Sequence, residues 1–435
     1  MTVWELFVDL GIAGALLLVG TLLRSRVVPI QRLFLPASVI AGLSGLALGP
    51  QGADWLPFSG SISGYPGVLI ALVFAALPFI AERVPLSSLS GRLMRLWAFS
   101  SISILLQWGG GIVVAVVLLR SIWVDLNPGF GTLIAVGFVG GHGTAAAAGQ
   151  VFADLGWPEA TSLAMMSATV GILSAVIGGM LWVRWAAATG RARHLTRFED
   201  LPTSLRTGLV MPPDRRSFGD EPVSSSTIDT LAFHVSLIAT AAVAGYYLSG
   251  WAALWFEAFR LPVFCMAFVC ASLLRLVLGV TGAHRFVDRH TMGHLSGGLT
   301  DVLVVFGIAS IRIAVLVEYA LPLGVMMATG ILLSGVVFRG LGPGALRESW
   351  LERSLFTWGW TTGVTAMGIA LLRIVDPDNE SDTLADFGIV YLFLAPVEVG
   401  LLAVVPLLLM QGQWMWLAGG SLLSAGVLVA ALLRR

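Results

Sequence analysis

Eleven apolar runs, each close to the length of a membrane-spanning helix, set the main limit on what this chain can fold into. The hydrocarbon core of a bilayer is about 30 Å thick and requires roughly 20 apolar residues per helix. Hydrophobic residues make up 57% of the 435 residues and charged residues only 11%, unlike a soluble domain. The runs cover residues 6–23, 33–49, 66–80, 97–119, 161–185, 228–248, 262–280, 295–311, 319–338, 387–409 and 414–433. The sequence therefore predicts an all-α polytopic membrane protein.

Charge and cysteine content exclude several classes of function. Basic and acidic residues number 25 each, so the net charge of zero indicates no nucleic-acid partner. Cys265 and Cys270 lie on different faces of one apolar run, which argues against a disulfide or a metal pair. The sequence shows no Ser-His-Asp arrangement, no paired carboxylates and no GxxxxGK(S/T) phosphate loop. We therefore expect no enzyme activity, no cofactor and no resident metal.

Two further stretches, residues 130–152 and 354–373, are long enough to span but are rich in Gly, Thr and Ala. Short cytoplasmic loops accumulate basic residues, so the arginines indicate how these stretches lie. If both are re-entrant hairpins and the amino terminus is outside, 21 arginines are cytoplasmic and only Arg120, Arg260 and Arg312 are outside. If both span, the split is 11 against 13. The count favours re-entrant hairpins, with the central linker and the carboxyl terminus in the cytoplasm.

The two halves of the chain resemble each other in opposite orientation. Five full spans precede a polar linker, so the second half enters the membrane inverted relative to the first. Leu-Pro steps at 35–36 and 261–262 open the second span of each half. Thr-Ala steps begin at Thr144 and Thr365, which lie 109 and 104 residues after Leu35 and Leu261.

These matching sequence features predict two inverted repeats of five transmembrane helices, each with a re-entrant hairpin, plus one extra carboxyl-terminal helix. The predicted parts are a first repeat over 1–190, a cytoplasmic linker over 191–226, a second repeat over 227–410 and the additional helix over 411–435. Two half-depth intrusions that meet near the midplane, one from each face, are typical of an alternating-access transporter.

The first hairpin carries the sequence GGHGT, which supplies five candidate binding residues. Gly140, Gly141 and Gly143 let the backbone unwind, because glycine reaches positive φ freely. Unwinding frees N–H groups for a carboxylate and carbonyl groups for a cation. Thr144 adds a hydroxyl, and His142 either donates to an anionic substrate or is a hydrogen-bonded structural residue. The alternative for the whole stretch is that small residues simply let helices cross closely.

The second hairpin supplies the opposite candidates. Thr361, Thr362 and Thr365 would contribute hydroxyls facing the first loop, and Gly359 and Gly363 would give the backbone its freedom.

Three charged residues lie within apolar runs, where an ionised side chain costs about 2.5 to 3.5 kcal/mol on insertion scales. Asp301 either helps to bind a cation or pairs within the bundle. Arg275 lies near the inner end of its run, so anchoring at the headgroups is favoured over a role in carboxylate binding. Glu398 is a third candidate for function.

The residues also resemble a known family. The stretch from Val139 to Thr144, followed by residues 164–171, resembles the first pore-loop region of bacterial sodium/glutamate symporters. The segments 261–289 and 359–370 occur in the corresponding order in the second half. However, residues 360–366, WTTGVTA, lack the proline of the family's Gly-Ala-Thr-Pro-Thr-Ala pattern, and the last helix is an addition to the family core.

The resemblance implies a homodimeric secondary transporter in the bacterial inner membrane, with hairpin-bearing transport domains that move against a dimerising scaffold. It implies Na+ as the coupling ion, L-glutamate or a similar small anion as the substrate, and the bilayer as the surroundings. Proton coupling, a different organic anion such as a dicarboxylate, and a passive channel remain as alternatives.

Overall fold

The computed structural model describes residues 2–80, 91–192, 196–215, 217–255, 261–347, 349–378 and 380–434, and every regular element within these ranges is helical. Nine helices in the described ranges are long and apolar enough to cross a membrane. The prediction of an all-α multi-pass membrane protein is therefore confirmed. Five arginines of the charge count, Arg83, Arg193, Arg216, Arg260 and Arg435, lie outside the described residues.

The first half of the chain ends with a long helix, which follows two shorter helices separated by a turn. Its helices are α1 (Val3–Arg26), α2 (Val28–Arg32), α3 (Ala37–Leu48), α4 (Tyr65–Ile80), α5 (Gly91–Val113), α6 (Arg120–Ile122), α7 (Leu133–Phe138), α8 (Gly141–Asp154) and α9 (Ala160–Ala188). A π-helical segment, Val114–Leu119, joins α5 to α6. A capping box begins α1, in which the Glu5 N–H donates to Thr2 Oγ1 and the Thr2 N–H donates to Glu5 Oε2.

The second half contains its main elements in a matching order. Its helices are α11 (Thr230–Trp255), α12 (Val263–Val280), α13 (Arg289–Ala309), α14 (Ile313–Glu318), α15 (Ala320–Val336), α16 (Gly342–Leu346), α17 (Trp350–Thr362), α18 (Thr365–Val375), α19 (Thr383–Met410) and α20 (Trp414–Leu433). A π-helical segment, Val337–Leu341, again continues the fourth long helix. Two prolines, Pro396 and Pro406, lie inside α19. Between the halves, α10 (Thr203–Thr207) is a single short turn of helix.

One of the predicted spans forms a shorter helix than expected. The run 33–49 becomes α3, of 12 residues, whereas the run 66–80 corresponds to α4, of 16 residues. Pro36 has φ −58° and ψ 144° and delays the start of α3, since a proline disfavours helical backbone in the residue before it. Gly49 is extended and ends the helix. Pro262 precedes α12 in the same conformation, with φ −61° and ψ 141°.

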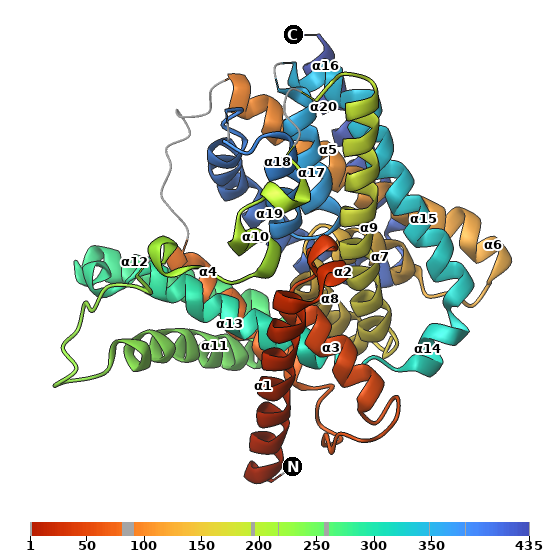
Figure 1. Cartoon of the computed structure of the whole chain (residues 1–435). Coiled ribbons are helices and arrows are strands. Elements are labelled where there is room, and N and C mark those ends of the chain that lie inside the picture. The colour runs from red at the N-terminus through yellow and green to blue at the C-terminus, as the bar shows by residue number, and fades with distance from the viewer. Residues whose placement is uncertain are drawn as a thin grey trace.

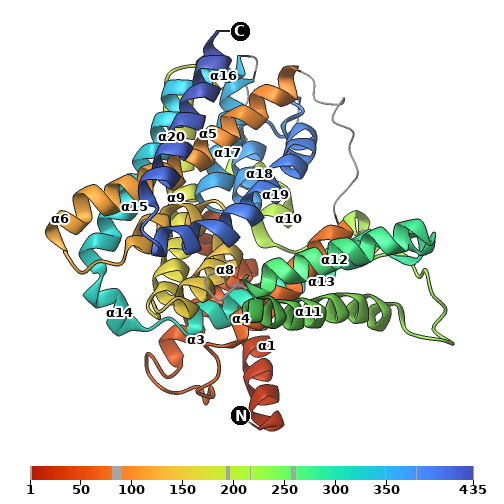
Figure 2. The same cartoon turned by 180° about the vertical axis from the view of Figure 1, so that it is seen from behind.

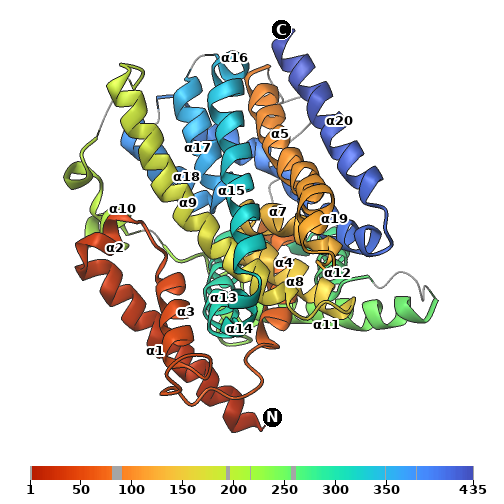
Figure 3. The same ribbon diagram turned by 90° about the vertical axis from the view of Figure 1, so that its right-hand side faces the viewer.

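The long helices run in two directions. Figures 1 and 2 show α11 and α12 side by side, lying crosswise to α5 and α20, and the two ends of the chain at opposite ends of the molecule. Figure 3 shows α5, α9, α15 and α20 running alongside one another. The helix α4 packs against α12 and α13, while α3 packs against α1 and α13.

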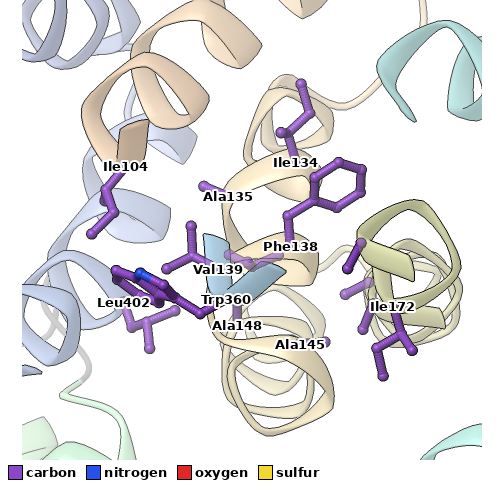
Figure 4. Close-up of a cluster of buried hydrophobic side chains, with 14 of the residues drawn as sticks. Ile104, Ile134, Ala135, Phe138, Val139, Ala145, Ala148, Ile172, Trp360 and Leu402 are labelled. Atoms are coloured by element: carbon purple, nitrogen blue, oxygen red, sulfur yellow. The ribbon is translucent and has the colours of Figure 1, made fainter. Parts of the chain in front are cut away.

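Two helical hairpins lie in the core. The first hairpin is α7 with α8, and the second hairpin is α17 with α18; these names are used below. Side chains of both meet in one buried apolar cluster, where Val139 and Trp360 lie among Ile104 of α5, Ile172 of α9 and Leu402 of α19 (Figure 4). The flanking long helices thus hold both hairpin turns inside the protein.

Candidate functional site

The turns of the two hairpins touch each other. A Cβ atom built on Gly141 would lie 2.7 Å from Val364 Cγ1 and 3.5 Å from the Gly363 carbonyl oxygen. These residues are more than 200 positions apart in the sequence, so the fold has brought together the two stretches that the sequence singled out.

Glycine is required at the first turn. Gly141 has φ +62°, a conformation that residues with a Cβ rarely adopt. At Gly140 a Cβ would fall within 1.9 Å of the Thr144 side chain. The Thr144 hydroxyl lies 2.5 Å from the Val136 carbonyl oxygen and 3.1 Å from that of Gly141, so it joins the two arms. Gly143 already lies within α8, so the unwound backbone is confined to residues 139 and 140.

The alanines after this turn serve close packing. Ala145 to Ala148 are buried, and a Cβ on Gly149 would lie 2.7 Å from Thr161 Cα of α9. The glycines thus form the turn, and the small residues beyond it let α8 approach α9.

Two helices begin at the hairpin turns without a side-chain cap. Gly140 is the N-cap of α8 and Val364 is the N-cap of α18, and neither can accept a hydrogen bond through its side chain. The first N–H groups of a helix have no partner within the helix and carry partial positive charge. Since the turns touch, these two helix ends converge on one region, and such ends are suited to bind an anion.

A cavity of about 350 Å³ lies beside the first turn. Six of the candidate residues line it: Gly140, His142, Gly143, Thr144, Asp301 and Glu398. The remaining wall comes mainly from α3, α4, α13 and α19, and it includes Val364 from the second turn.

His142 is buried and makes a structural hydrogen bond while it lines the cavity. Its Nε2 lies 3.1 Å from Thr169 Oγ1 on α9, and that hydroxyl also donates to the Met165 carbonyl. The bond fixes the ring against α9. Both interpretations made from the sequence, a structural residue and a ligand contact, are compatible with this position.

Two carboxylates from different helices face the same cavity. Asp301 of α13 lies next to the Ser38 hydroxyl, which hydrogen-bonds to it. Glu398 of α19 has a buried Oε1 without a hydrogen-bond partner among the described residues. An acid in this position is suited to hold a cation. Among the residues that the structure describes, no group of three His, Cys, Asp or Glu side chains forms a metal site.

The second hairpin places most of its predicted residues away from the cavity. Thr361 donates its hydroxyl to the Thr357 carbonyl, and Thr362 donates to the Trp358 carbonyl, so both hydroxyls are engaged within α17. Gly359 supports the fold-back itself, because a Cβ there would lie 2.6 Å from Gly368 Cα on α18. Thr365, the first residue of α18, is exposed.

Arg275 lies outside the central cavity. Its guanidinium donates to the carbonyl of Pro78 in the last turn of α4, and it lines a different cavity. Cations are favoured at a helix carboxyl terminus, so this contact stabilises the end of α4.

Two polar clusters were not identified from the sequence. At the base of the second hairpin, Arg353 Nη2 lies 2.9 Å from Asp386 Oδ2, and Arg92 Nη2 lies 2.8 Å from Asp386 Oδ1. In α1, the buried Asp9 accepts hydrogen bonds from the Ser59 N–H and hydroxyl and from the Tyr65 hydroxyl, at 2.5 to 2.8 Å. For Asp9 the sequence signal was a charge inside an apolar run, whereas Arg92, Arg353 and Asp386 lie outside the runs and gave no signal. The partners in both clusters lie 30 or more residues apart.

The fold and the cavity define a multi-pass helical membrane protein with a partly polar internal cavity. Residues 5–343 match the family model described as sodium/glutamate symporter, and the chain belongs to this family. The family indicates a transporter rather than an enzyme, with Na+ as the coupling ion and glutamate as the substrate. The match includes the first hairpin and ends before the second. Searches of curated proteins and of solved structures give no match.

Proposed function

We propose that this protein takes up glutamate, or a similar small carboxylate, by sodium-coupled alternating access with elevator-like movement. One observation carries the proposal: the hairpin turns of the two halves touch at Gly141 and Val364, beside a cavity of about 350 Å³. A site built on two touching turns can be opened from either side when one group of helices moves.

In this proposal the substrate carboxylate binds at the uncapped start of α8. The N–H groups from Gly141 to Gly143 point their partial positive charge toward it, and Thr144 and His142 bound the site. Asp301 binds the sodium ion.

The second hairpin takes a complementary part. Thr365 and the start of α18 contact the substrate from the side opposite α8. Gly363 lies at the contact between the two turns. Thr361 and Thr362 stabilise α17 through hydrogen bonds within the helix. Gly359 lets α17 and α18 pack closely.

The proposed architecture is two inverted repeats, 1–190 and 227–410, with a cytoplasmic linker over 191–226 and the extra helix over 411–435. The matching order of elements supports it, since each half has a proline before its second main helix, a π-helical segment in its fourth and a hairpin before its last. We propose that the hairpins are re-entrant, that the amino terminus is outside the inner membrane and that the protein is a homodimer.

The test is uptake of labelled L-glutamate into proteoliposomes with an inward sodium gradient, an inward proton gradient or neither. Accumulation with sodium alone is expected. Accumulation with protons alone would establish proton coupling instead, and equilibration without accumulation would establish a passive channel. If no gradient gives glutamate uptake, the substrate assignment is wrong, and other small carboxylates, dicarboxylates among them, replace glutamate in the assay.

A matched pair of glycine variants ties transport to the touching turns. Gly141→Val introduces a side chain against Val364 at a positive φ, and we expect uptake to fall to background. Gly156→Val meets the same backbone strain, at φ +93°, but in open space. Equal loss of uptake in both variants, at equal protein yield, would remove the turns from the transport site.

A further inference from the structure

Glu398 is a charged residue of the central cavity wall to which the proposed function gives no role. It belongs to α19, and its Oε1 is buried without a hydrogen-bond partner in the part of the chain that the structure describes. Asp301, by contrast, accepts a hydrogen bond from the Ser38 hydroxyl. A buried carboxylate without a partner is costly, because its charge has lost water and gained no other contact. A cation from outside the protein would remove this cost.

Two further cavities lie along α19, and one of them also contacts Glu398. A cavity of about 590 Å³ between α4, α12 and α19 is the larger neighbour of the central cavity, with Tyr391 in the walls of both, but Glu398 does not line it. A cavity of about 480 Å³ between α5, α19 and α20 does include Glu398. The other polar side chains among its described lining residues are Trp97, Ser101 and Ser424, and none of them is a cation.

The 480 Å³ cavity opens toward the bilayer. In its wall, Val397, Leu423 and Val427 are 55%, 71% and 61% exposed. Exposed apolar side chains on membrane-spanning helices face lipid chains, which offer no stabilisation to a small cation. We therefore place the cationic partner of Glu398 on its other side, in the central cavity.

The wall around Glu398 is poor in oxygen atoms. Its other α19 residues in the central cavity are Tyr391, Ala395, Val399 and Leu402. Tyr391 supplies the one side-chain oxygen of this group, and it lies seven residues away, about 10.5 Å along the helix axis. A small hard cation takes several oxygen ligands, so this part of the wall is poorly suited to a metal ion.

Oxygen atoms gather instead around Asp301. The cavity wall there includes Thr300, the neighbour of Asp301 in α13, and Ser38, whose hydroxyl bonds to the Asp301 carboxylate. The two carboxylates thus have different surroundings. Asp301 is suited to sodium, and Glu398 is suited to a cation that brings its own hydrogen-bond donors, as an ammonium group does.

The central cavity therefore presents both signs of charge to a ligand. The starts of α8 and α18 carry partial positive charge suited to carboxylates, and Glu398 presents a carboxylate. Its volume of about 350 Å³ lies in the range of small-molecule sites. This combination matches an α-amino acid, which carries an ammonium group beside its carboxylates.

We propose that Glu398 binds the α-ammonium group of the substrate and so selects amino acids over carboxylates that have no amino group. The proposal rests on the proposed function, because it takes the central cavity as the transport site. Glutarate has the carbon chain and both carboxylates of glutamate but no amino group. Bound glutarate would leave Glu398 unpaired, and such a site rejects an analogue that lacks the bonded group.

Competition for uptake tests the proposal with the full-length protein in proteoliposomes under an inward sodium gradient. Unlabelled L-glutamate and glutarate compete with labelled L-glutamate, and we expect the wild-type protein to require about 100-fold more glutarate for half-inhibition. In Glu398→Gln we expect KM for glutamate to rise about 10- to 100-fold and the preference over glutarate to disappear. Thermal stabilisation of the purified variant by each ligand, at saturating sodium, gives the same comparison if its uptake is too slow to measure.

Two control variants separate the charge of Glu398 from other effects. Glu398→Asp keeps a carboxylate at this position and should retain a preference for glutamate. Glu318→Gln makes the same chemical change at an exposed residue at the end of α14, outside the walls of these three cavities, and should behave as the wild-type protein does.

The outcomes distinguish this proposal from the proposed function. If the wild-type protein shows no sodium-driven uptake of glutamate, the proposed function fails and this proposal fails with it. If uptake is normal but Glu398→Gln keeps the full preference over glutarate, this proposal alone is overturned. A rise in the Na+ concentration for half-maximal uptake in Glu398→Gln, with the preference unchanged, would instead identify Glu398 as a sodium ligand.

Discussion

The two hairpins differ in what surrounds their turns. Around the first turn, His142 and Thr144 line the central cavity, and the glycines bring the start of α8 to its edge. Around the second, Thr361 and Thr362 are buried with their hydroxyls bonded inside α17, and Val364 is its residue in the cavity wall. The first hairpin therefore offers polar groups to a ligand, while the second forms a packed support behind it.

The base of the second hairpin strengthens this contrast. Asp386 joins Arg353 of α17 to Arg92 of α5, and Arg353 also donates to the Ser381 carbonyl. Nothing similar is found at the base of the first hairpin among the described ion pairs, where Glu159 and Arg312 are 3.9 Å apart and partly exposed. One hairpin is fixed by charge, and the other is held mainly by packing.

Breaking the ionic base should have the largest effect on stability. Asp386→Ala removes the carboxylate from a guanidinium that is only 5% exposed, and a broken buried pair costs about 3–5 kcal/mol. Glu199→Ala breaks the exposed pair with Arg32, which is worth about 0–1 kcal/mol. Chemical unfolding in detergent measures both. Comparable losses would show that the second hairpin does not depend on its ionic base.

The sodium dependence of uptake tests the division of labour at the cavity. Asp301→Asn removes a charge from the cavity wall, and we expect the Na+ concentration for half-maximal uptake to rise about tenfold, or ~1.4 kcal/mol. The control is Asp154→Asn, at the end of α8, where the carboxylate accepts from Gln150 at 2.8 Å outside the cavity. An unchanged sodium dependence in Asp301→Asn would indicate that Glu398, and not Asp301, binds the sodium ion.

Threonine variants compare the two turns directly. Thr144→Val removes the hydroxyl that joins the arms of the first hairpin at the cavity, and we expect KM for glutamate to rise about fivefold, equivalent to ~1 kcal/mol. Thr362→Val removes a hydrogen bond inside α17 and should leave KM unchanged. A higher KM in Thr362→Val alone would reverse the roles of the two hairpins.

The smallest effect is expected at Gln107. Its Nε2 donates to the Thr361 carbonyl at 2.8 Å and to Ser334 Oγ at 3.2 Å, while its Oε1 is buried without a hydrogen-bond partner among the described residues. Gln107→Leu loses both bonds but also removes the unsatisfied oxygen, so the net change should stay within about 1 kcal/mol. A much larger loss of unfolding free energy would show that these bonds fix the second turn.

The positions of the helices and of both hairpin turns could be predicted from the sequence. Hydropathy located the long helices, and clusters of glycine and threonine located the turns near Gly140 and Gly363. The length of α3 could not be predicted, because an apolar run continues through a loop as readily as through a helix. Pro36 and Gly49 decided where this helix begins and ends.

The part of the candidate site formed by the first hairpin could be predicted from the sequence, and the part formed by the second could not. Backbone freedom at Gly141 is a local property, and positive φ appears where the glycines stand. Whether a threonine hydroxyl faces a ligand or its own helix depends on the neighbouring helices, so the orientation of Thr361 and Thr362 could not be read from the sequence. The same holds for Asp9, whose partners Ser59 and Tyr65 lie 50 and 56 residues further along.

The prolines of α19 have a mechanical consequence. Pro396 and Pro406 lack an N–H, so the carbonyls of Leu392 and Leu402 lose their helical donors. The helix therefore lacks two of its backbone hydrogen bonds. Kinks in long helices concentrate at such points. Because α19 lines both the central cavity and its larger neighbour, a bend at these prolines would change the shape of both cavities together.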